Sequence, residues 1–395
     1  MRGEIVIVGG GIMGCSTAYW ISQLAPHQHI TIMEMDGIAS SSSGKAGGFL
    51  ARGWHGGGTM QQLHEVGFDL IEEFATKHKL PSYRKVPMYS LSHRGSACKD
   101  LPWLDNKEVT YSLDDPATAQ ITPKELTEAF LKHAGPNVTT RIGVKVTGVE
   151  MSDTDNKVVK GVTIVDLKSN TTMKVDCEAL IVCTGAWAGL TSSWFPREQL
   201  TVPRINMGGI KSSSLVYHAD PPQDDARRKE VNDKLLQHPA VLFCEDDRNG
   251  CHLEVYPRPN GDVYLCGLGG SPQLSADQIE NMLPRDVLPN ENRVELAHQG
   301  FMKMTSQDAS KGRLPDFKTA CLRPIMPDGL PVMGPLMNSS GEELKNVFVN
   351  AGHNCWGILW SGVSGKVIAE LVVEGEGKCM CLKPFHPKRL LNKNR

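Results

Sequence analysis

The sequence predicts an α/β fold combined with an α+β part, organised as two structural domains. The chain of 395 residues exceeds the size that one hydrophobic core normally reaches, and it is long enough to bury a cofactor pocket. Near the N-terminus, a short apolar run is followed by a glycine-rich turn and a segment of helical composition. The middle of the chain contains short β-rich runs separated by turn residues, which indicates a sheet-rich second part.

Charge and composition narrow the classes of partner. Lys and Arg number 42 against 44 Asp and Glu, and this balance argues against nucleic acid or an anionic membrane as the main partner. We find no apolar run of membrane-spanning length and no leader before the first strand, so we expect a cytoplasmic protein with no membrane span. The 11 cysteines are an odd number and scattered, as expected of reduced thiols. Cys379, Cys381 and His386 lack a second ligand pair, so we expect no metal site.

The N-terminal segment has the pattern of a strand, a turn and a helix. Glu4 to Val8 (EIVIV) is a β-branched run, GGGIMG follows it, and Cys15 to Leu24 has helical composition. A second strand, His29 to Met33, ends at Glu34, 20 residues after Gly14. This order is typical of a Rossmann-type dinucleotide-binding unit.

Each residue of this motif has a physical reason. Gly9 permits the tight turn, Gly11 lets the backbone approach a pyrophosphate at the helix N-terminus, and Gly14 lets helix and strand pack closely. Glu34 is spaced to accept hydrogen bonds from ribose hydroxyls. NAD and FAD both remain open at this point. The predicted contacts of this unit are Gly9, Gly11, Ile12, Met13, Gly14 and Glu34.

A small-residue segment, ASSSSGKAGGFL, follows at residues 39–50. A flexible linker here would cut a βαβ unit before its sheet is complete. The segment resembles the second flavin-contacting segment of the D-amino-acid oxidase superfamily, which contains glycine oxidase and sarcosine oxidase. The resemblance implies FAD rather than NAD as the cofactor. It places Ser42, Ser43, Gly44, Lys45, Ala46, Gly47 and Gly48 beside the ribityl and diphosphate portions.

The next part of the chain fits the same family. Thr122 and Glu125 form a capping-box pattern with Pro123 at the first helical position, which predicts a helix from about Pro123 to His133. Three β-rich runs (139–149, 158–166 and 171–176) and a buried strand, Ala179 to Cys183, follow. The resemblance implies cofactor contacts at Val146, Thr184, Gly185 and Trp187, although packing is the more natural role for the tryptophan.

Residues 200–320 differ in composition from the segments before them. His218 to Gln237 is dense in charge and proline and predicts a solvated surface segment, whereas Leu253 to Gly267 predicts a hairpin that turns at Asn260-Gly261. In the resembled family this region forms a large mixed β-sheet that roofs the flavin and carries the substrate, and the chain then returns to the first domain. We therefore expect a discontinuous FAD-binding domain of residues 1–85, 140–200 and 322–395, and a substrate domain of residues 86–139 and 201–321.

One arginine lies in an otherwise apolar stretch, CLRPIMPDGLPVMG, at residues 321–334. A buried guanidinium is costly unless an anion meets it. Arg323 has two candidate partners, an internal acid such as Asp328 or a bound ligand. The Leu-Arg-Pro pattern resembles the glycine oxidase segment whose arginine grips the substrate carboxylate, which implies the ligand. A guanidinium suits that role because it makes a two-pronged contact and keeps its proton.

Cys321 and the C-terminal segment complete the predicted site. Sarcosine oxidases attach FAD covalently through a cysteine that aligns with Cys321, and a thiol beside an arginine ionises more easily, but cysteine is also a common buried filler. Val347 to Val349 predicts a strand, and Ile358 to Val373 predicts a helix that ends at Gly375. The resemblance places the N-terminus of this helix at the flavin N1 and C2 oxygen. The candidates there are Gly352, His353, Asn354, Gly357 and Ile358, of which His353 has an alternative role in bonding a loop carbonyl.

The resemblance implies oxidation of an amino acid or secondary amine that carries a carboxylate. A hydride passes to flavin N5, an imine forms, and O2 reoxidises the cofactor with formation of H2O2. Tyr264 stands near the place of the lysine with which sarcosine oxidases activate oxygen, and glycine oxidases also lack that lysine. An NAD-dependent dehydrogenase and a flavin-binding protein with an interaction or trafficking role are the alternatives. The oligomeric state stays open.

Overall fold

The computed structural model describes residues 3–54, 57–92, 101–104, 110–196, 200–218, 233–305 and 314–393. The charged segment predicted at 218–237 therefore falls outside the described residues from 219 to 232. The described chain forms two large sheets and two small ones. The α/β and mixed-sheet architecture confirms the predicted fold class.

The first large sheet contains the predicted N-terminal unit. Its buried strand β1 lies between two parallel neighbours, and Ile5 and Ile7 face a cluster of helices while Val6 and Val8 face the opposite core. The predicted strands at 4–8, 29–33, 179–183 and 347–349 are all present. In sheet order the strands are β19 (Val332–Met337), β20 (Glu343–Ala351), β12 (Ala179–Val182), β1 (Ile5–Val8), β2 (Ile30–Glu34) and β8 (Val138–Ile142).

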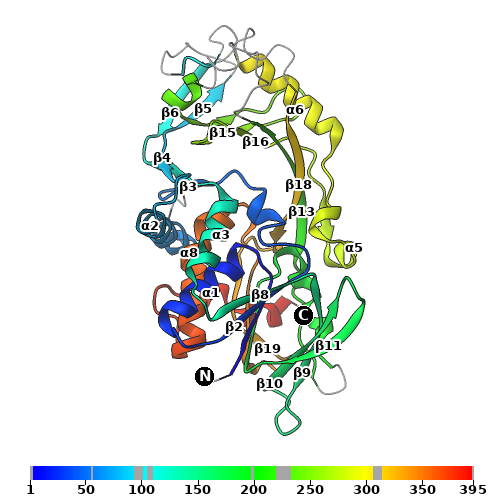
Figure 1. The fold of residues 1–395 in the computed structure, drawn as a ribbon. Coiled ribbons are helices and arrows are strands. Elements are labelled where there is room, and N and C mark those ends of the chain that lie inside the picture. Colours follow the sequence, from blue (N-terminus) through cyan, green and yellow to red (C-terminus); the bar gives the residue numbers. More distant parts are fainter. Residues whose placement is uncertain are drawn as a thin grey trace.

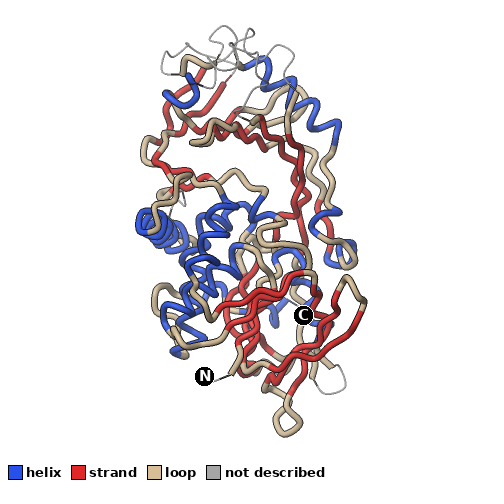
Figure 2. Tube along the Cα trace, viewed as in Figure 1, coloured by secondary structure: helices blue, strands red, loops and turns tan. Residues whose placement is uncertain are grey.

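One face of this sheet is covered by helices α1 (Ile12–Leu24), α2 (Gln61–Lys77), α3 (Pro123–His133) and α8 (Gly357–Glu374). The opposite face is covered by the small antiparallel sheet of β9 (Val144–Met151), β10 (Val159–Asp166) and β11 (Thr171–Asp176). Figures 1 and 2 show these layers in the lower part of the molecule. Helix α8 ends at Gly375, whose φ of 81° is the left-handed cap predicted from the sequence.

Helix α8 corrects one expectation from the sequence. Within the described residues, the segment Asn354–Glu374 is long and apolar enough to cross a membrane, and 72% of its apolar window is buried inside the protein. Its backbone packs tightly on α1, because a Cβ at Gly365 would lie 2.2 Å from the Ser16 hydroxyl oxygen. The apolar character of α8 is thus accounted for by its place in the core.

Helix α3 has the predicted bounds, but the predicted capping box is wrong. Thr122 makes no side-chain cap hydrogen bond. Instead, Ser82 bridges both groups: its hydroxyl accepts from the Thr122 amide at 2.9 Å, and its amide donates to Glu125 at 3.1 Å. A serine 40 residues upstream therefore accepts the hydrogen bond from the Thr122 amide at the start of the helix.

The second large sheet has eight strands and contains the predicted hairpin. β15 and β16 are antiparallel, and the connecting turn has Gly261 at φ 86°. In sheet order the strands are β17 (Gln273–Ser275), β13 (Gly208–Tyr217), β16 (Val263–Cys266), β15 (Glu254–Pro257), β14 (Val241–Cys244), β5 (Met88–Ser92) and β6 (Thr110–Asp115), and β18 (Phe317–Ile325) pairs with β13. In Figure 1 this sheet arches above α1, α3 and α8, with α6 (Glu291–Met304) along its outer side.

The remaining elements connect these layers. The second small sheet contains β3 (Phe49–Ala51), β7 (Thr118–Gln120) and β4 (Arg84–Lys85). Short helices are α5 (Ala276–Ile279), η1 (Ser42–Gly44), η2 (Gly185–Trp194), η3 (Pro284–Asp286), η4 (Asn354–Trp356), η5 (Lys383–Phe385) and η6 (Pro387–Lys393).

The six-stranded sheet draws its strands from three separate stretches of the chain. Packing departs from the predicted domain boundaries at two points. Helix α3 packs on α1, with the rings of Phe130 and Tyr19 5.6 Å apart, and β18 stays paired with β13 past residue 322, up to Ile325.

Candidate functional site

A cavity of about 480 Å³ lies between the two large sheets and contacts both. It is bounded on one side by the ends of β1, β2 and β12 and by the N-termini of α1 and α8, and on the other by β13, β15, β16 and β18. This is the crevice at the carboxyl ends of parallel strands where α/β sheets bind ligands. The predicted site residues that line it are Gly9, Gly11, Ile12, Met13, Glu34, Ser42, Ser43, Lys45, Ala46, Gly47, Gly48, Val146, Thr184, Gly185, Trp187, Cys321, Arg323, Gly352, His353, Asn354, Gly357 and Ile358.

Gly14 and Gly44 were predicted as cofactor contacts but do not line the cavity. Both instead allow backbones to pack closely. A Cβ at Gly14 would lie 2.0 Å from the Gly9 carbonyl oxygen, and one at Gly44 would lie 2.1 Å from the Ala39 carbonyl oxygen. For Gly14, this is the helix–strand packing that the motif predicts.

The N-terminus of α1 faces the cavity at the glycine-rich turn. Gly9 has φ 113°, and a Cβ on it would lie 2.4 Å from the Cys183 carbonyl oxygen, so only glycine fits this turn. The Ile12 amide donates to the Ser43 hydroxyl at 2.8 Å, which ties the small-residue segment to the start of the helix. The positive end of the helix dipole suits an anionic diphosphate.

Glu34 lies at the end of β2, where the sequence predicts the ribose-binding acid. Its carboxylate accepts from the Gly10 amide at 2.7 Å and from the Asp36 amide at 2.8 Å, so its position is fixed. Burial raises its pKa, although these amide bonds oppose the shift. Trp187 is held in a packing role, since its indole donates to the carbonyls of Ile279 and Met282 at 3.0 and 3.1 Å.

His353 lies before the N-terminus of α8 and is buried. Its Nε2 is 3.1 Å from the Ser364 hydroxyl. The alternative role predicted for His353 was a hydrogen bond to a loop carbonyl, and the structure shows a bond to a buried hydroxyl instead. Burial lowers its pKa from 6.5 to about 3. The imidazole is therefore neutral near pH 7 and is unsuited to exchange protons with a substrate there.

We expect His353 to make stability depend on pH. Between pH values of about 3 and 6.5 the unfolded state binds a proton at this imidazole and the folded state does not, so stability is complete above this window and falls as pH falls through it. At about pH 5 the loss is about 2 kcal/mol. In His353→Asn, the difference in unfolding free energy between pH 7 and pH 5, measured by urea titration, should shrink by this amount. His27→Asn, at an exposed position, should leave the difference unchanged; equal pH dependence in wild type and His353→Asn would contradict the argument.

Strand alternation collects the polar side chains of the second sheet on one face. Cys321 and Arg323 are two apart on β18, and Ser212 on β13 is the register partner of Cys321. Tyr264 and Cys266 alternate in the same way on β16. All five line the cavity, so this face forms its roof. Tyr264 donates from its hydroxyl to the Lys45 carbonyl at 2.7 Å and so joins the roof to the small-residue segment.

Arg323 is partly buried and has no carboxylate partner within the part of the chain that the structure describes. Its Nη2 donates to the Ser212 hydroxyl at 3.1 Å, and its buried Nε makes no hydrogen bond to any described group. Asp328, the internal candidate, accepts instead from Arg389 at 3.2 Å. The predicted pairing of Arg323 with Asp328 is therefore wrong, and the guanidinium keeps bonding capacity at Nε.

Three thiols, those of Cys266, Cys321 and Cys355, lie near this guanidinium and line the cavity. Burial raises the pKa of each thiol, and this effect outweighs the opposing influence of the arginine charge. Arg323 does favour ionisation of Cys321, as expected, but burial outweighs it and the pKa of this thiol is raised. Neutral thiols do not compete with a carboxylate for the guanidinium, and covalent attachment of FAD at Cys321 stays a prediction.

Sequence reasoning missed an acid and an aromatic wall. Glu254 on β15 lines the cavity, as do Phe49, Trp54 and Phe243. The ring centroid of Phe49 lies 4.9 Å from that of Trp54 and 5.2 Å from that of Phe243, so the three rings form one cluster. The alternation in LEVYPRPNGDVYLCG, which places Glu254 on the same face as Cys266, was the available signal for the acid. Phe243 comes from a segment distant from Phe49 and Trp54, so no local signal showed that the three rings meet.

Comparison with known proteins gives a family match and a shared fold. Residues 4–371 match the family model DAO, described as FAD dependent oxidoreductase. A proposed oxidoreductase of Schizosaccharomyces pombe is 25% identical over 406 residues, which cover 94% of each protein. The crystal structure of L-proline dehydrogenase from P. horikoshii aligns with a TM-score of 0.73 at 18% identity over 99% of this chain and 98% of that one. Glycine oxidase from Geobacillus kaustophilus aligns with a TM-score of 0.68 at 17% identity over 98% of each chain.

Proposed function

Because the chain belongs to the DAO family of FAD-dependent oxidoreductases, we propose that it oxidises an amino acid or secondary amine that carries a carboxylate. Family membership decides between the two dinucleotides in favour of FAD and sets aside the NAD-dependent alternative. The substrate, the imine product and reoxidation by O2 with release of H2O2 belong to the proposal.

The residues of the cavity fit FAD. The N-terminus of α1 and the close approach at Gly9 and Gly11 suit the diphosphate, and Glu34 suits the ribose. The buried Thr184 hydroxyl makes no hydrogen bond to the described protein and lines the same cavity, so it has bonding capacity for a ligand. The N-terminus of α8, at Gly357, suits the end of the cofactor where negative charge accumulates on reduction.

When bound, FAD supplies the acceptor for the hydride that leaves the α-carbon. The protein supplies placement and electrostatics. Arg323 would hold the substrate carboxylate, and Phe49, Trp54 and Phe243 would keep water away from the apolar part of the substrate. His353 is neutral and bonded to Ser364, so it shapes the cavity and leaves the amine to arrive unprotonated or to lose its proton elsewhere.

The observation that carries this proposal is the guanidinium of Arg323. It lies on the cavity roof with an unused Nε, and its nearest sequence acid, Asp328, is paired with Arg389. A charge-assisted contact to a substrate carboxylate is worth about 1.5 to 3 kcal/mol. That contribution anchors the substrate so that its α-carbon faces the cofactor side of the cavity.

The test is anaerobic reduction of the bound flavin. We would mix the purified yellow protein with glycine, sarcosine and both enantiomers of proline and alanine, and record the loss of flavin absorbance. At least one carboxylated amine should bleach the flavin, and its amide should do so far more slowly. Failure of every carboxylated amine would contradict the proposal and would favour a flavin-binding protein with an interaction or trafficking role.

A further inference from the structure

We propose that Glu254 binds the amine of the substrate, opposite the carboxylate-binding Arg323. This inference rests on the proposed function and deepens it, because it assigns the second charged contact of the substrate. It defines the substrate class as a zwitterion whose two charges are read by two side chains on one sheet face.

Glu254 lies on the roof of the cavity, on the sheet that carries Arg323. It is the first residue of β15, its register partner on β16 is Cys266, and both side chains line the cavity with Arg323. In the sheet, β15 pairs with β16, β16 pairs with β13, and β13 pairs with β18. The acid and the arginine therefore belong to one continuous surface. Residues on that surface face the same ligand.

The carboxylate of Glu254 is held at one oxygen, Oε2. Oε2 accepts from the Tyr256 hydroxyl and from the Cys266 thiol, the latter at 3.3 Å. Oε1 accepts no hydrogen bond from the residues that the structure describes. Two donors thus orient the carboxylate while one oxygen remains available for an N–H donor.

The charges on the roof are arranged to suit a zwitterion. Glu254 forms no ion pair with any described Lys, Arg or His. Arg323 lies beyond ion-pair distance of Glu254, although the two charges interact. The other groups near Glu254 are the neutral side chains of Tyr256, Cys244 and Cys266. A cation and an anion that share the cavity roof without forming an ion pair are complementary to a zwitterion. A neutral amine also has an N–H to donate, so the contact persists when the nitrogen loses its proton.

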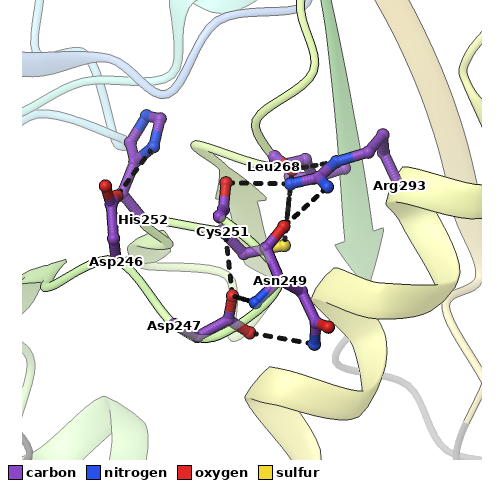
Figure 3. A network of polar contacts seen from close by, with 8 residues as sticks. Asp246, Asp247, Asn249, Cys251, His252, Leu268 and Arg293 are labelled. Carbon is purple, nitrogen blue, oxygen red and sulfur yellow. Dashed lines mark hydrogen bonds and ion pairs between the residues drawn. The ribbon is translucent and has the colours of Figure 1, made fainter.

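Arg293 of α6 ties together the two chain segments at the open end of the hairpin that carries Glu254, as Figure 3 shows. Its guanidinium donates to the carbonyls of Asn249 and Gly250 before β15, at 2.7 and 2.8 Å, and to the carbonyl of Leu268 after β16, at 2.6 Å. A fixed hairpin holds the carboxylate in place before the substrate arrives, which reduces the ordering cost of binding.

The test compares amines with carboxylic acids of the same shape in Glu254→Gln. The pairs are glycine and propionate, sarcosine and butyrate, and L-proline and cyclopentanecarboxylate. Apparent affinity for the amines comes from the concentration dependence of anaerobic flavin reduction, and affinity for the acids comes from the shift of the flavin spectrum. Glu245→Gln, at an exposed position beyond β14, is the matched control.

We expect Glu254→Gln to weaken amines about tenfold or more while each matched acid changes by less than about twofold. The control should change neither. Equal weakening of amine and acid would show that Glu254 only supports the roof, and unchanged amine affinity would show that it makes no contact; either result overturns the inference and leaves the proposed oxidation standing. If no amine reduces or perturbs the wild-type flavin, the proposed function fails together with this inference.

Discussion

Arg323→Leu should lower the second-order rate constant of flavin reduction by carboxylated amines by about 10- to 150-fold, and it should leave FAD bound. The guanidinium is the one group placed to meet the carboxylate among those that the structure describes on the cavity roof, and leucine leaves that carboxylate desolvated without a partner. The measurement is the second-order rate constant of anaerobic flavin bleaching, with FAD content taken from the absorbance of the purified variant.

Two controls separate carboxylate binding from general damage. L-prolinamide and glycinamide lack the carboxylate, so Arg323→Leu should change their slow reaction much less than that of the parent acids. Ser212→Ala removes only the hydroxyl that accepts from Arg323 Nη2, and we expect an effect of less than about tenfold. Equal rates for wild type and Arg323→Leu with carboxylated amines would remove Arg323 from the site.

The parts of the fold and site that the sequence predicted depend on short spacings along the chain. Gly9, Gly14 and Glu34 are separated by one strand, one turn and one helix, so their arrangement follows from local geometry. The turn at Gly261 is also fixed by two residues and their conformational freedom. These local rules placed the N-terminal unit and the β15–β16 hairpin correctly.

The parts that the sequence did not predict depend on contacts between distant segments. The start of α3 has a capping-box pattern, but Ser82 hydrogen-bonds both the Thr122 amide and the Glu125 carboxylate in its place. This arrangement depends on a contact between two segments that are distant in sequence. Asp328 is the acid nearest to Arg323 in sequence, but its partner in the fold is Arg389, 61 residues later. Glu254 joins Arg323 only because the pairing of four strands fixes which side chains share a face.

Gly9→Ala should abolish most FAD binding. Gly9 has φ 113°, and its added Cβ would lie 2.4 Å from the carbonyl oxygen of Cys183 and 2.9 Å from the carbonyl carbon. Those atoms belong to the backbone that follows β12, so no side-chain rotation relieves the clash, and the strained conformation alone costs about 1 to 3 kcal/mol. The turn must shift, and it carries the N-terminus of α1 away from the diphosphate.

We expect FAD affinity to fall by more than about tenfold, measured as the flavin-to-protein absorbance ratio after dialysis and by fluorescence titration of the apoprotein. Gly53→Ala is the matched control, because a Cβ there would meet no atom within 4 Å and its φ is not positive. That variant should bind FAD as wild type does. A yellow Gly9→Ala protein with full flavin content would show that the turn tolerates a side chain and that the glycine-rich motif does not form the diphosphate site.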